Sequence, residues 1–191
     1  MKKLNWGILG TGWIAHEMGE ALTAVNGEIY AVCNVRLAGA QQYAEEFGVQ
    51  KVYGSPDEMF ADENVDIVYI ATPHNLHYEA MLKALKAGKH VFCEKSITVN
   101  SRQLEECAAL AEEKGLIICD GTTLLHMPLY KKLRQIIEEG AIGDVKMVQV
   151  NFGSCKEYDV NNRFFSKELA GGALLDIGVY AVSFARYFMK S

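Results

Sequence analysis

The chain has 191 residues, more than one typical domain needs and few for two, so we expect one domain and part of a second. Half of the residues are hydrophobic, 23% are charged and the formal net charge is -5, which excludes a strongly basic protein that binds nucleic acid or an anionic membrane surface. We find no apolar run long enough to cross a bilayer, and polar residues interrupt the N-terminal apolar stretch too early for a secretion signal.

The first predicted elements are a strand and a helix joined by a glycine-rich turn, GILGTGWIA at residues 7–15. Gly10 suits the tight turn, Gly12 lets the backbone approach a pyrophosphate, and Ala15 allows the helix to pack closely on the strand. A loop that merely contains three small residues is the alternative. The strand, the helix and the N-terminal position favour a dinucleotide site with its phosphates at the helix N-terminus. The residues that we assign to cofactor binding here are Gly10, Thr11, Gly12, Trp13 and Ile14.

Strand-like and helix-like segments then alternate as far as Asp120. Strands are expected at residues 4–9, 28–34, 51–53, 65–71, 90–94 and 116–120, and helices at 13–23, 38–47, 77–87 and 101–114. Asn100 and Gln103 form a capping box before the last of these helices, and Gly115 ends it. The alternation predicts an α/β fold, a doubly wound parallel sheet of the Rossmann type with helices on both faces, over residues 1–120.

The pattern changes after Asp120, where we expect a second domain over residues 121–191. Helices are predicted at 128–139 and 176–189, and a strand at 145–152, in which apolar and polar residues alternate as in a sheet with one covered face. Such a strand needs neighbours, and no further strand follows it. We therefore expect an incomplete part of an α+β domain in a truncated chain.

The five cysteines are an odd number without a C-x-x-C pair, and most lie in apolar segments, which predicts buried, reduced thiols in a cytoplasmic protein. They are Cys33, Cys93, Cys107, Cys119 and Cys155. We predict no metal site.

Ligands of an open parallel sheet lie beyond the carboxyl ends of its strands. The residue after the second strand, which faces the adenosine ribose, is Asn34, with Arg36 two positions on. No carboxylate there would repel a 2′-phosphate and a cation would attract it, so NADP is favoured over NAD. The alternative is that Arg36 is a solvated surface residue.

Two later loops, ATPHNLH at 71–77 and CEKS at 93–96, should border the nicotinamide half of the cofactor. A Thr-Pro pair such as Thr72-Pro73 is common in loops and does not by itself indicate a binding site. A histidine near a helix start, such as His74 or His77, is more often a packing residue than an acid-base group. Lys95 differs, because it ends an apolar strand at the predicted crevice. We assign these loop residues to cofactor binding: Thr72, Pro73, His77, Glu94 and Lys95.

A further segment, GGALLDIGVY at 171–180, places Asp176 and Tyr180 four residues apart on one face of a predicted helix. Tyrosines in apolar helices are usually core residues, so the spacing alone is weak.

Five motifs in order, GILGTGWIA, VDIVYIATPHNLH, HVFCEKSITVN, EEGAIGDVKMVQVNFG and GGALLDIGVY, resemble the glucose-fructose oxidoreductase, inositol dehydrogenase and rhizopine-catabolism (Gfo/Idh/MocA) family of NAD(P)-dependent oxidoreductases. The resemblance implies a Rossmann domain followed by a mostly antiparallel sheet domain, in a protein longer than this chain that forms homo-oligomers. It also implies a small-molecule substrate with a CH–OH or C=O group, such as a sugar, a cyclitol or a vicinal diol. The tyrosine at position 180 is similar to that of the dihydrodiol dehydrogenase and glucose-fructose oxidoreductase branch.

By the same resemblance, Lys95 matches the lysine of a Glu-Lys-Pro motif, Asp176 the aspartate of Asp-x-Gly, and Tyr180 the acid-base position, so these three are the expected catalytic residues. Ser96 replaces the motif's proline, whose bond to lysine is often cis. A cis bond before serine costs about 2.5 to 4 kcal/mol, so a different placement of Lys95 is expected. Leu125 stands where that branch tends to carry arginine, which leaves the substrate open.

The expected chemistry is hydride transfer, which leaves one proton to move on the substrate oxygen. An unperturbed tyrosine has a pKa of about 10. A lysine charge at about 4 Å, at an effective dielectric near 20, contributes about 4 kcal/mol and would bring that pKa toward neutrality. The alternatives are a non-catalytic NAD(P)-binding or sugar-sensing protein, or an inactive fragment of the enzyme.

Overall fold

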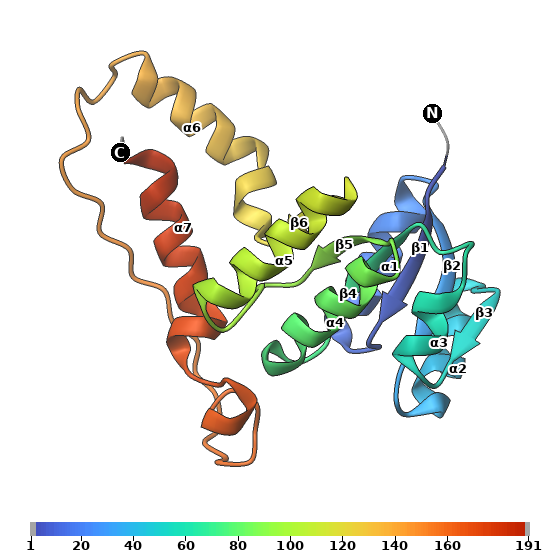
Figure 1. Ribbon diagram of the computed structural model, residues 1–191. Coiled ribbons are helices and arrows are strands. Elements are labelled where there is room, and N and C mark those ends of the chain that lie inside the picture. Colours follow the sequence, from blue (N-terminus) through green and yellow to red (C-terminus); the bar gives the residue numbers. More distant parts are fainter. Residues whose placement is uncertain (1–2, 190–191) are drawn as a thin grey trace. The chain divides into compact units, whose positions relative to one another are not determined.

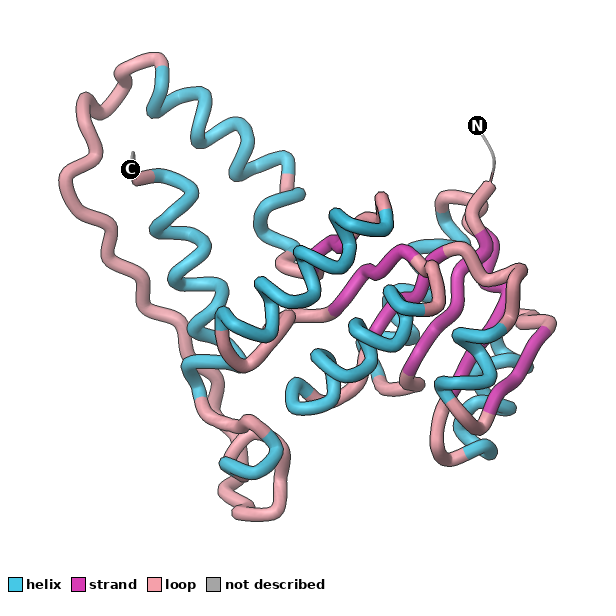
Figure 2. Tube along the Cα trace, viewed as in Figure 1, coloured by secondary structure: helices cyan, strands magenta, loops and turns pink. Residues whose placement is uncertain are grey.

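The computed structural model describes residues 3–189. The chain divides into two compact units, the first ending at Asp120 and the second beginning at Gly121. Figure 2 shows that strands and helices alternate in the first unit, whereas helices and long loops make up the second.

The first unit contains a six-stranded sheet in the order β3-β2-β1-β4-β5-β6, and every pair of neighbouring strands is parallel (Figure 1). The strands are β1 Asn5–Leu9, β2 Glu28–Cys33, β3 Lys51–Tyr53, β4 Ile67–Ile70, β5 His90–Cys93 and β6 Ile118–Asp120. This order is that of the Rossmann fold, and the direction of winding reverses between β1 and β4. The predicted fold class is therefore confirmed for this unit.

Five helices connect the strands: α1 Trp13–Ala24, α2 Leu37–Phe47, α3 Pro56–Ala61, α4 His74–Lys86 and α5 Ser101–Lys114. Helix α3 was not predicted, because six residues are too few for a visible apolar period. Pro56 in its first turn, followed by two acidic residues, was the available signal. Helix α4 begins three residues earlier than predicted, immediately after Pro73.

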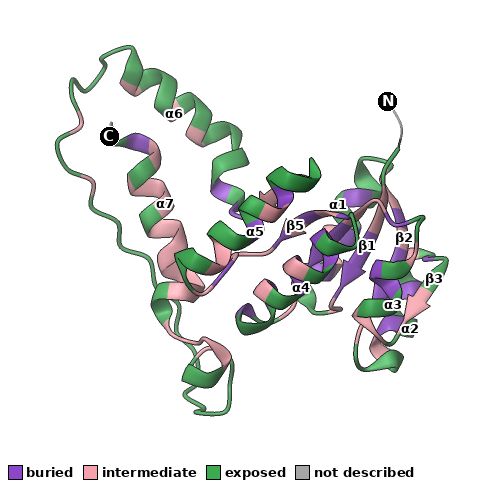
Figure 3. Ribbon diagram, viewed as in Figure 1, coloured by how far each residue is buried: buried purple, intermediate pink, exposed green. Residues whose placement is uncertain are grey.

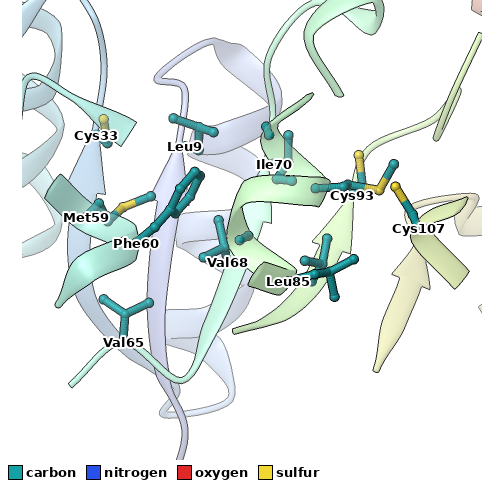
Figure 4. Packing of buried hydrophobic residues seen from close by; sticks show 14 of the residues in the cluster. Leu9, Cys33, Met59, Phe60, Val65, Val68, Ile70, Leu85, Cys93 and Cys107 are labelled. Atoms are coloured by element: carbon teal, nitrogen blue, oxygen red, sulfur yellow. The ribbon is translucent and has the colours of Figure 1, made fainter. Parts of the chain in front are cut away.

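Two apolar clusters cover the two faces of the sheet. Alternate strand residues point to opposite faces, so Ile8 and Tyr69 pack with α1 and α2, whereas Leu9 and Ile70 pack with α3, α4 and α5. Figure 4 shows the cluster on the face covered by α3, α4 and α5, in which Leu85 of α4 lies fully buried among strand residues. Because both faces are covered, the central strands read as nearly continuous apolar runs.

Polar contacts fix the ends of several elements in this unit. The Asn100 side chain accepts a hydrogen bond from Gln103 N at 3.1 Å, and Gly115 ends α5 with a φ of 65°, as the sequence predicts. Asp62, the residue after α3, accepts hydrogen bonds from the hydroxyls of Tyr30 at 3.0 Å and Tyr53 at 2.7 Å. Asp62 thereby ties α3 to β2 and β3.

The second unit contains a 3-10 turn Thr123–His126, helix α6 Pro128–Glu138, a second 3-10 turn Lys167–Leu169, a π-helical turn Leu174–Gly178, and helix α7 Val179–Phe188. The strand predicted at 145–152 is not found, and this prediction is wrong for the structure described. A strand needs a partner for its N–H and C=O groups, and residues 121–189 contain no other strand. Met147 and Phe152 are accordingly exposed, at 78% and 56%.

Residues Lys167–Phe188, a stretch of 22 residues that includes the 3-10 turn, the π-helical turn and α7, contain an 18-residue window with a mean hydropathy of 1.3, long and apolar enough to cross a membrane by length and composition. The expectation that no segment reaches this length is wrong on that measure, since the polar turn from Lys167 to Leu169 extends the apolar helix behind it. One such segment is weak evidence for a membrane span, and a carboxylate such as Asp176 inside it would be costly in a bilayer.

Burial differs between the parts of the chain that the structure describes, as Figure 3 shows. Fully buried residues gather in the strands and on the sheet-facing sides of the helices of the first unit. All five cysteines are free thiols: Cys33, Cys93 and Cys107 are buried, Cys119 is half-buried and Cys155 is exposed.

Candidate active site

The predicted site residues of the first unit follow the strands at one edge of the sheet. The residue directly after each of four strands donates its N–H to the last residue of a neighbouring strand: Asn34 to Tyr53 O at 3.2 Å, Gly10 to Cys33 O at 2.9 Å, Ala71 to Leu9 O at 2.8 Å and Glu94 to Ile70 O at 2.9 Å. These bonds continue the ladder one residue past the strands. They bring the glycine turn and the loops after β2, β4 and β5 to the edge where ligands of this fold lie.

The glycine turn leaves the N-terminus of α1 open. Gly10 has a φ of +100°, and a Cβ there would lie 2.6 Å from Ala71 O, so only glycine fits between the two loops. Gly12 precedes the helix without a side-chain cap, and a Cβ there would meet no atom within 4 Å. Trp13 is 67% exposed and Ile14 is half-buried. The open helix end therefore offers backbone N–H groups and a positive dipole end to an anion.

Asn34 connects the glycine turn to the loop after β2. Its Nδ2 donates to Thr11 Oγ1, and its Oδ1 accepts from Arg36 N at 3.0 Å. Gly39 makes room for this link, since a Cβ there would lie 3.1 Å from Thr11 Oγ1. The Asn34 amide is thus engaged within the protein, and the exposed Arg36 is the group of this loop that carries charge. The link from Thr11 to Asn34 was not predicted, because the two residues are 23 positions apart.

The loop after β4 carries an unsatisfied polar atom. The buried Oγ1 of Thr72 has no hydrogen-bond partner among residues 3–189. Buried hydroxyls are nearly always paired, so an unpaired one at this edge indicates a place for a ligand or a water molecule. Pro73 is exposed and precedes the first turn of α4.

His77 lies beneath this loop rather than at its surface. Its ring is fully buried, with Nε2 at 2.8 Å from Thr72 O and Nδ1 at 2.8 Å from Ser96 O. Burial lowers the pKa of the imidazole, against the effect of its backbone acceptors. His77 has no exposed surface with which to touch a cofactor, so any role that it has there acts through the two loops.

The loop after β5 holds a half-buried carboxylate beside the predicted lysine. Glu94 Oε1 accepts from the Tyr69 hydroxyl at 2.6 Å, and its Oε2 accepts from Lys95 N at 3.2 Å. Burial raises the pKa of Glu94, and the Tyr69 hydrogen bond opposes this rise. Tyr69 was not predicted as a site residue, because its strand reads only as an apolar run. The peptide bond from Lys95 to Ser96 is cis, the isomer that the resemblance associates with proline.

In the second unit, a glycine pair places Asp176 next to Arg163. A Cβ on Gly171 would lie 2.6 Å from Arg163 O, and Gly172 has a φ of +112°, so both positions require glycine. Arg163 Nη1 is 4.0 Å from Asp176 Oδ1. Sequence reasoning missed Arg163, since nothing in its own segment marks it.

Asp176 and Tyr180 lie on consecutive turns, the first in the π-helical turn and the second in α7. The Tyr180 ring meets that of Phe152 edge-on, with centroids 5.9 Å apart. Tyr180 is half-buried. Single π-helical turns are frequent at functional sites. Lys95 belongs to the first unit and these two residues to the second, so a common site for the three stays a prediction.

No group of three or more His, Cys, Asp or Glu side chains with the geometry of a metal site occurs within residues 3–189. The donors of the site are hydroxyls, backbone N–H groups and single charged side chains.

Comparison with known proteins identifies two matched regions. The oxidoreductase family with an NAD-binding Rossmann fold (GFO_IDH_MocA) matches residues 4–122, and the GFO/IDH/MocA C-terminal domain matches residues 130–191.

Among characterised relatives, the chain is 37% identical over 183 residues to trans-1,2-dihydrobenzene-1,2-diol dehydrogenase of Xenopus laevis, covering 94% of this chain and 55% of the relative. It is 36% identical over 204 residues to D-xylose 1-dehydrogenase (NADP(+)) of Hypocrea jecorina, covering 94% of this chain and 51% of that one. Among solved structures, KijD10, a 3-ketoreductase from Actinomadura kijaniata in complex with NADP, superposes with a TM-score of 0.86 at 31% identity, over 98% of this chain and 57% of that one. The chain thus spans about half the length of these relatives.

Proposed function

The chain belongs to the Gfo/Idh/MocA family of oxidoreductases. We propose that it forms part or all of an NAD(P)-dependent dehydrogenase or reductase that acts on a CH–OH or C=O group of a sugar, cyclitol or vicinal diol. The observation that carries the proposal is the edge of the first unit. The N-terminus of α1 is open there, and Gly10 lies too close to Ala71 O for any other residue to fit. The unpaired hydroxyl of Thr72 follows the neighbouring strand β4. The names of the relatives, a diol dehydrogenase, a xylose dehydrogenase and a ketoreductase, support the same class of reaction.

The residues at this edge fit a nicotinamide dinucleotide. Gly10, Thr11, Gly12, Trp13 and Ile14 would hold the pyrophosphate through the turn and the N-terminus of α1. Thr72, Pro73, Glu94 and Lys95 would line the nicotinamide half, where the free Oγ1 of Thr72 finds a partner. The dinucleotide supplies the hydride-accepting or hydride-donating ring.

We propose NADP as the preferred cofactor. Asn34 presents no carboxylate to the adenosine ribose, and its side chain holds the backbone of Arg36, whose guanidinium is exposed. A 2′-phosphate would gain a charge-assisted contact there that NAD lacks. The xylose dehydrogenase and the ketoreductase among the relatives are described with NADP(+) and NADP.

For catalysis we propose Tyr180 as the acid-base group, Lys95 as the cation that lowers the pKa of its hydroxyl, and Asp176 as the residue that orients Lys95 or a substrate hydroxyl. Tyr180 would hold the proton at Oη and exchange it with the substrate oxygen as the carbinol and carbonyl forms interconvert. The roles of these three residues rest on the resemblance of their motifs.

Fluorescence titration with NADPH and with NADH, followed by turnover assays on sugars and vicinal diols, tests the proposal. We expect NADPH to bind more tightly than NADH and at least one of these substrates to be turned over. If the protein binds neither nucleotide, this edge of the sheet is not a dinucleotide site and the proposal is contradicted.

The second candidate is a non-catalytic NAD(P)-binding or sugar-sensing protein, or a fragment that keeps the nucleotide fold without activity. The chain spans about half the length of the enzymes that it resembles, and the acid-base role of Tyr180 rests on a motif alone. Cofactor binding without turnover would support this second candidate.

The proposed partners are a small-molecule substrate and further copies of the chain, with neither nucleic acid nor a membrane. We propose a cytoplasmic location, because all five thiols are free and a reducing compartment preserves them.

A further inference from the structure

The His77 side chain connects two loops that are far apart in the sequence. It extends from the first turn of α4, with no exposed surface, and meets Thr72 O of the loop after β4 and Ser96 O of the loop after β5. Both contacts are 2.8 Å long. The Thr72 contact spans 5 positions in the sequence, whereas the Ser96 contact spans 19, so the ring joins its own helix start to a different strand's end.

The chemistry of the contacts makes the ring a spacer. Both partners are carbonyl oxygens, which only accept hydrogen bonds, so the neutral imidazole donates its single N–H to one of them, chosen by the tautomer, and only the imidazolium donates to both. An imidazole is planar and rigid, and its two nitrogens diverge from one edge, so it fixes the separation of the two carbonyls in a way that a flexible side chain does not. A buried carbonyl that loses its donor is costly, so the arrangement resists opening.

Each of the two loops carries a residue of the proposed site. The first carries Thr72, whose hydroxyl is unpaired, and the second carries Lys95, which directly precedes Ser96. Glu94 ties the second loop to β4 through the Tyr69 hydroxyl, so His77 provides a second, independent tie on the other side of Lys95.

We propose that His77 is a positioning residue that sets the distance between the loops after β4 and β5, and thereby the places of Thr72 and Lys95 against the nicotinamide half of the cofactor. The claim that His77 joins the two loops depends only on its contacts with Thr72 O and Ser96 O, whereas its effect on the cofactor rests on the proposed function. His77 does not take part in proton transfer, because it has no surface that a substrate reaches.

Three variants separate the two contacts. The amide of Asn places its N–H₂ near the position of Nδ1, so His77→Asn offers a donor to Ser96 O and none to Thr72 O. The longer Gln places its N–H₂ near Nε2, so His77→Gln offers a donor to Thr72 O and none to Ser96 O. His77→Leu fills the space and offers no donor. The matched control is Met81→Ala, one turn further along α4, which is also fully buried but packs only in the apolar cluster.

The first measurement is amide hydrogen exchange without cofactor, in the segments 71–76 and 94–98. We expect faster exchange in at least one of the two segments for His77→Leu, faster exchange in 94–98 than in 71–76 for His77→Gln, and the reverse order for His77→Asn. Met81→Ala should lower the melting temperature at least as much as His77→Leu while leaving exchange in both segments unchanged relative to the rest of the unit.

The second measurement is NADPH titration of the same proteins. We expect about tenfold weaker binding for His77→Leu, smaller losses for the Asn and Gln variants, and no change for Met81→Ala.

Native exchange in both segments of His77→Leu, or the same acceleration in Met81→Ala, would overturn the proposal. If His77→Leu does not fold, the opposite patterns of the Asn and Gln variants decide it, and identical patterns in those two would refute it. If the unaltered chain binds no NADPH, the proposed function fails, while the exchange data still decide whether His77 joins the loops.

Discussion

The two units of the chain differ in how completely their elements are partnered. In the first, every strand has a parallel neighbour and each sheet face is covered by helices, so apolar residues such as Leu85 are fully buried. In the second, α6 has no buried residue along its described length, and Leu129 on that helix is 59% exposed. Sequence periodicity predicts an element reliably where the fold supplies its partner, and less reliably where the described chain does not.

The largest expected effect tests whether the first unit binds the cofactor while the second supplies the acid-base residue. Tyr180→Phe removes the proposed proton donor and leaves the nucleotide edge of the first unit intact. We expect turnover to fall by about 10²- to 10⁴-fold with nearly unchanged NADPH affinity, because general acid-base catalysis contributes a factor of this size. Steady-state kinetics and fluorescence titration measure the two quantities. Equal losses in both would refute the catalytic role of Tyr180.

A pair of leucine variants tests the difference in packing directly. Leu85→Ala removes a fully buried side chain of α4 and should cost about 2 to 5 kcal/mol of unfolding free energy. Leu129→Ala truncates an exposed side chain of α6 and should change that free energy by less than about 0.5 kcal/mol. Urea denaturation followed by circular dichroism gives both values. A similar cost at the two sites would mean that α6 is covered in solution.

The smallest expected effect is the pH dependence of one polar contact in the first unit. Burial would raise the pKa of Asp62, but hydrogen bonds from the Asn64 backbone and from Tyr53, Asn64 and Tyr30 side chains outweigh it and lower the pKa from 3.8 to about 2. A carboxyl with a lowered folded-state pKa stabilises the fold fully above its unfolded value and loses this contribution as the pH falls toward the folded value.

The pH window for Asp62 is therefore about pH 4 to pH 2. Because the group is largely solvated, we expect a contribution of about 1 kcal/mol. Asp62→Asn should be less stable than the unaltered chain at pH 5, and the difference should shrink as the pH approaches 2. Urea denaturation across this range checks it, and a difference independent of pH would contradict the assignment to ionised Asp62.

The sequence predicts all six strands of the first unit within two residues, because their apolar runs face helices on both sides. It fails at 145–152, where the alternation describes a strand whose neighbours are not among residues 3–189. Helix α3 was not predicted, because its sequence signals are a proline and two acidic residues rather than a helical repeat of apolar residues.

For the candidate site, sequence reasoning identified the positions after the strands, since a parallel sheet aligns those ends by itself. It did not identify the side-chain partners. The hydroxyl of Tyr69 on Glu94, the Asn34 amide on Thr11 and the His77 ring on Ser96 O each join residues 19 to 25 positions apart. Such pairs are set by the register of neighbouring strands, which no local pattern contains.

The unequal shielding of the thiols makes this protein suited to selective labelling. Burial raises the pKa of Cys33 to about 12 and that of Cys107 to about 11, so their reactive thiolates are scarce at neutral pH. Cys155 is exposed and lies in the second unit. A maleimide dye attached there, with the two tryptophans of the first unit, Trp6 and Trp13, as energy donors, would report the separation of the two units.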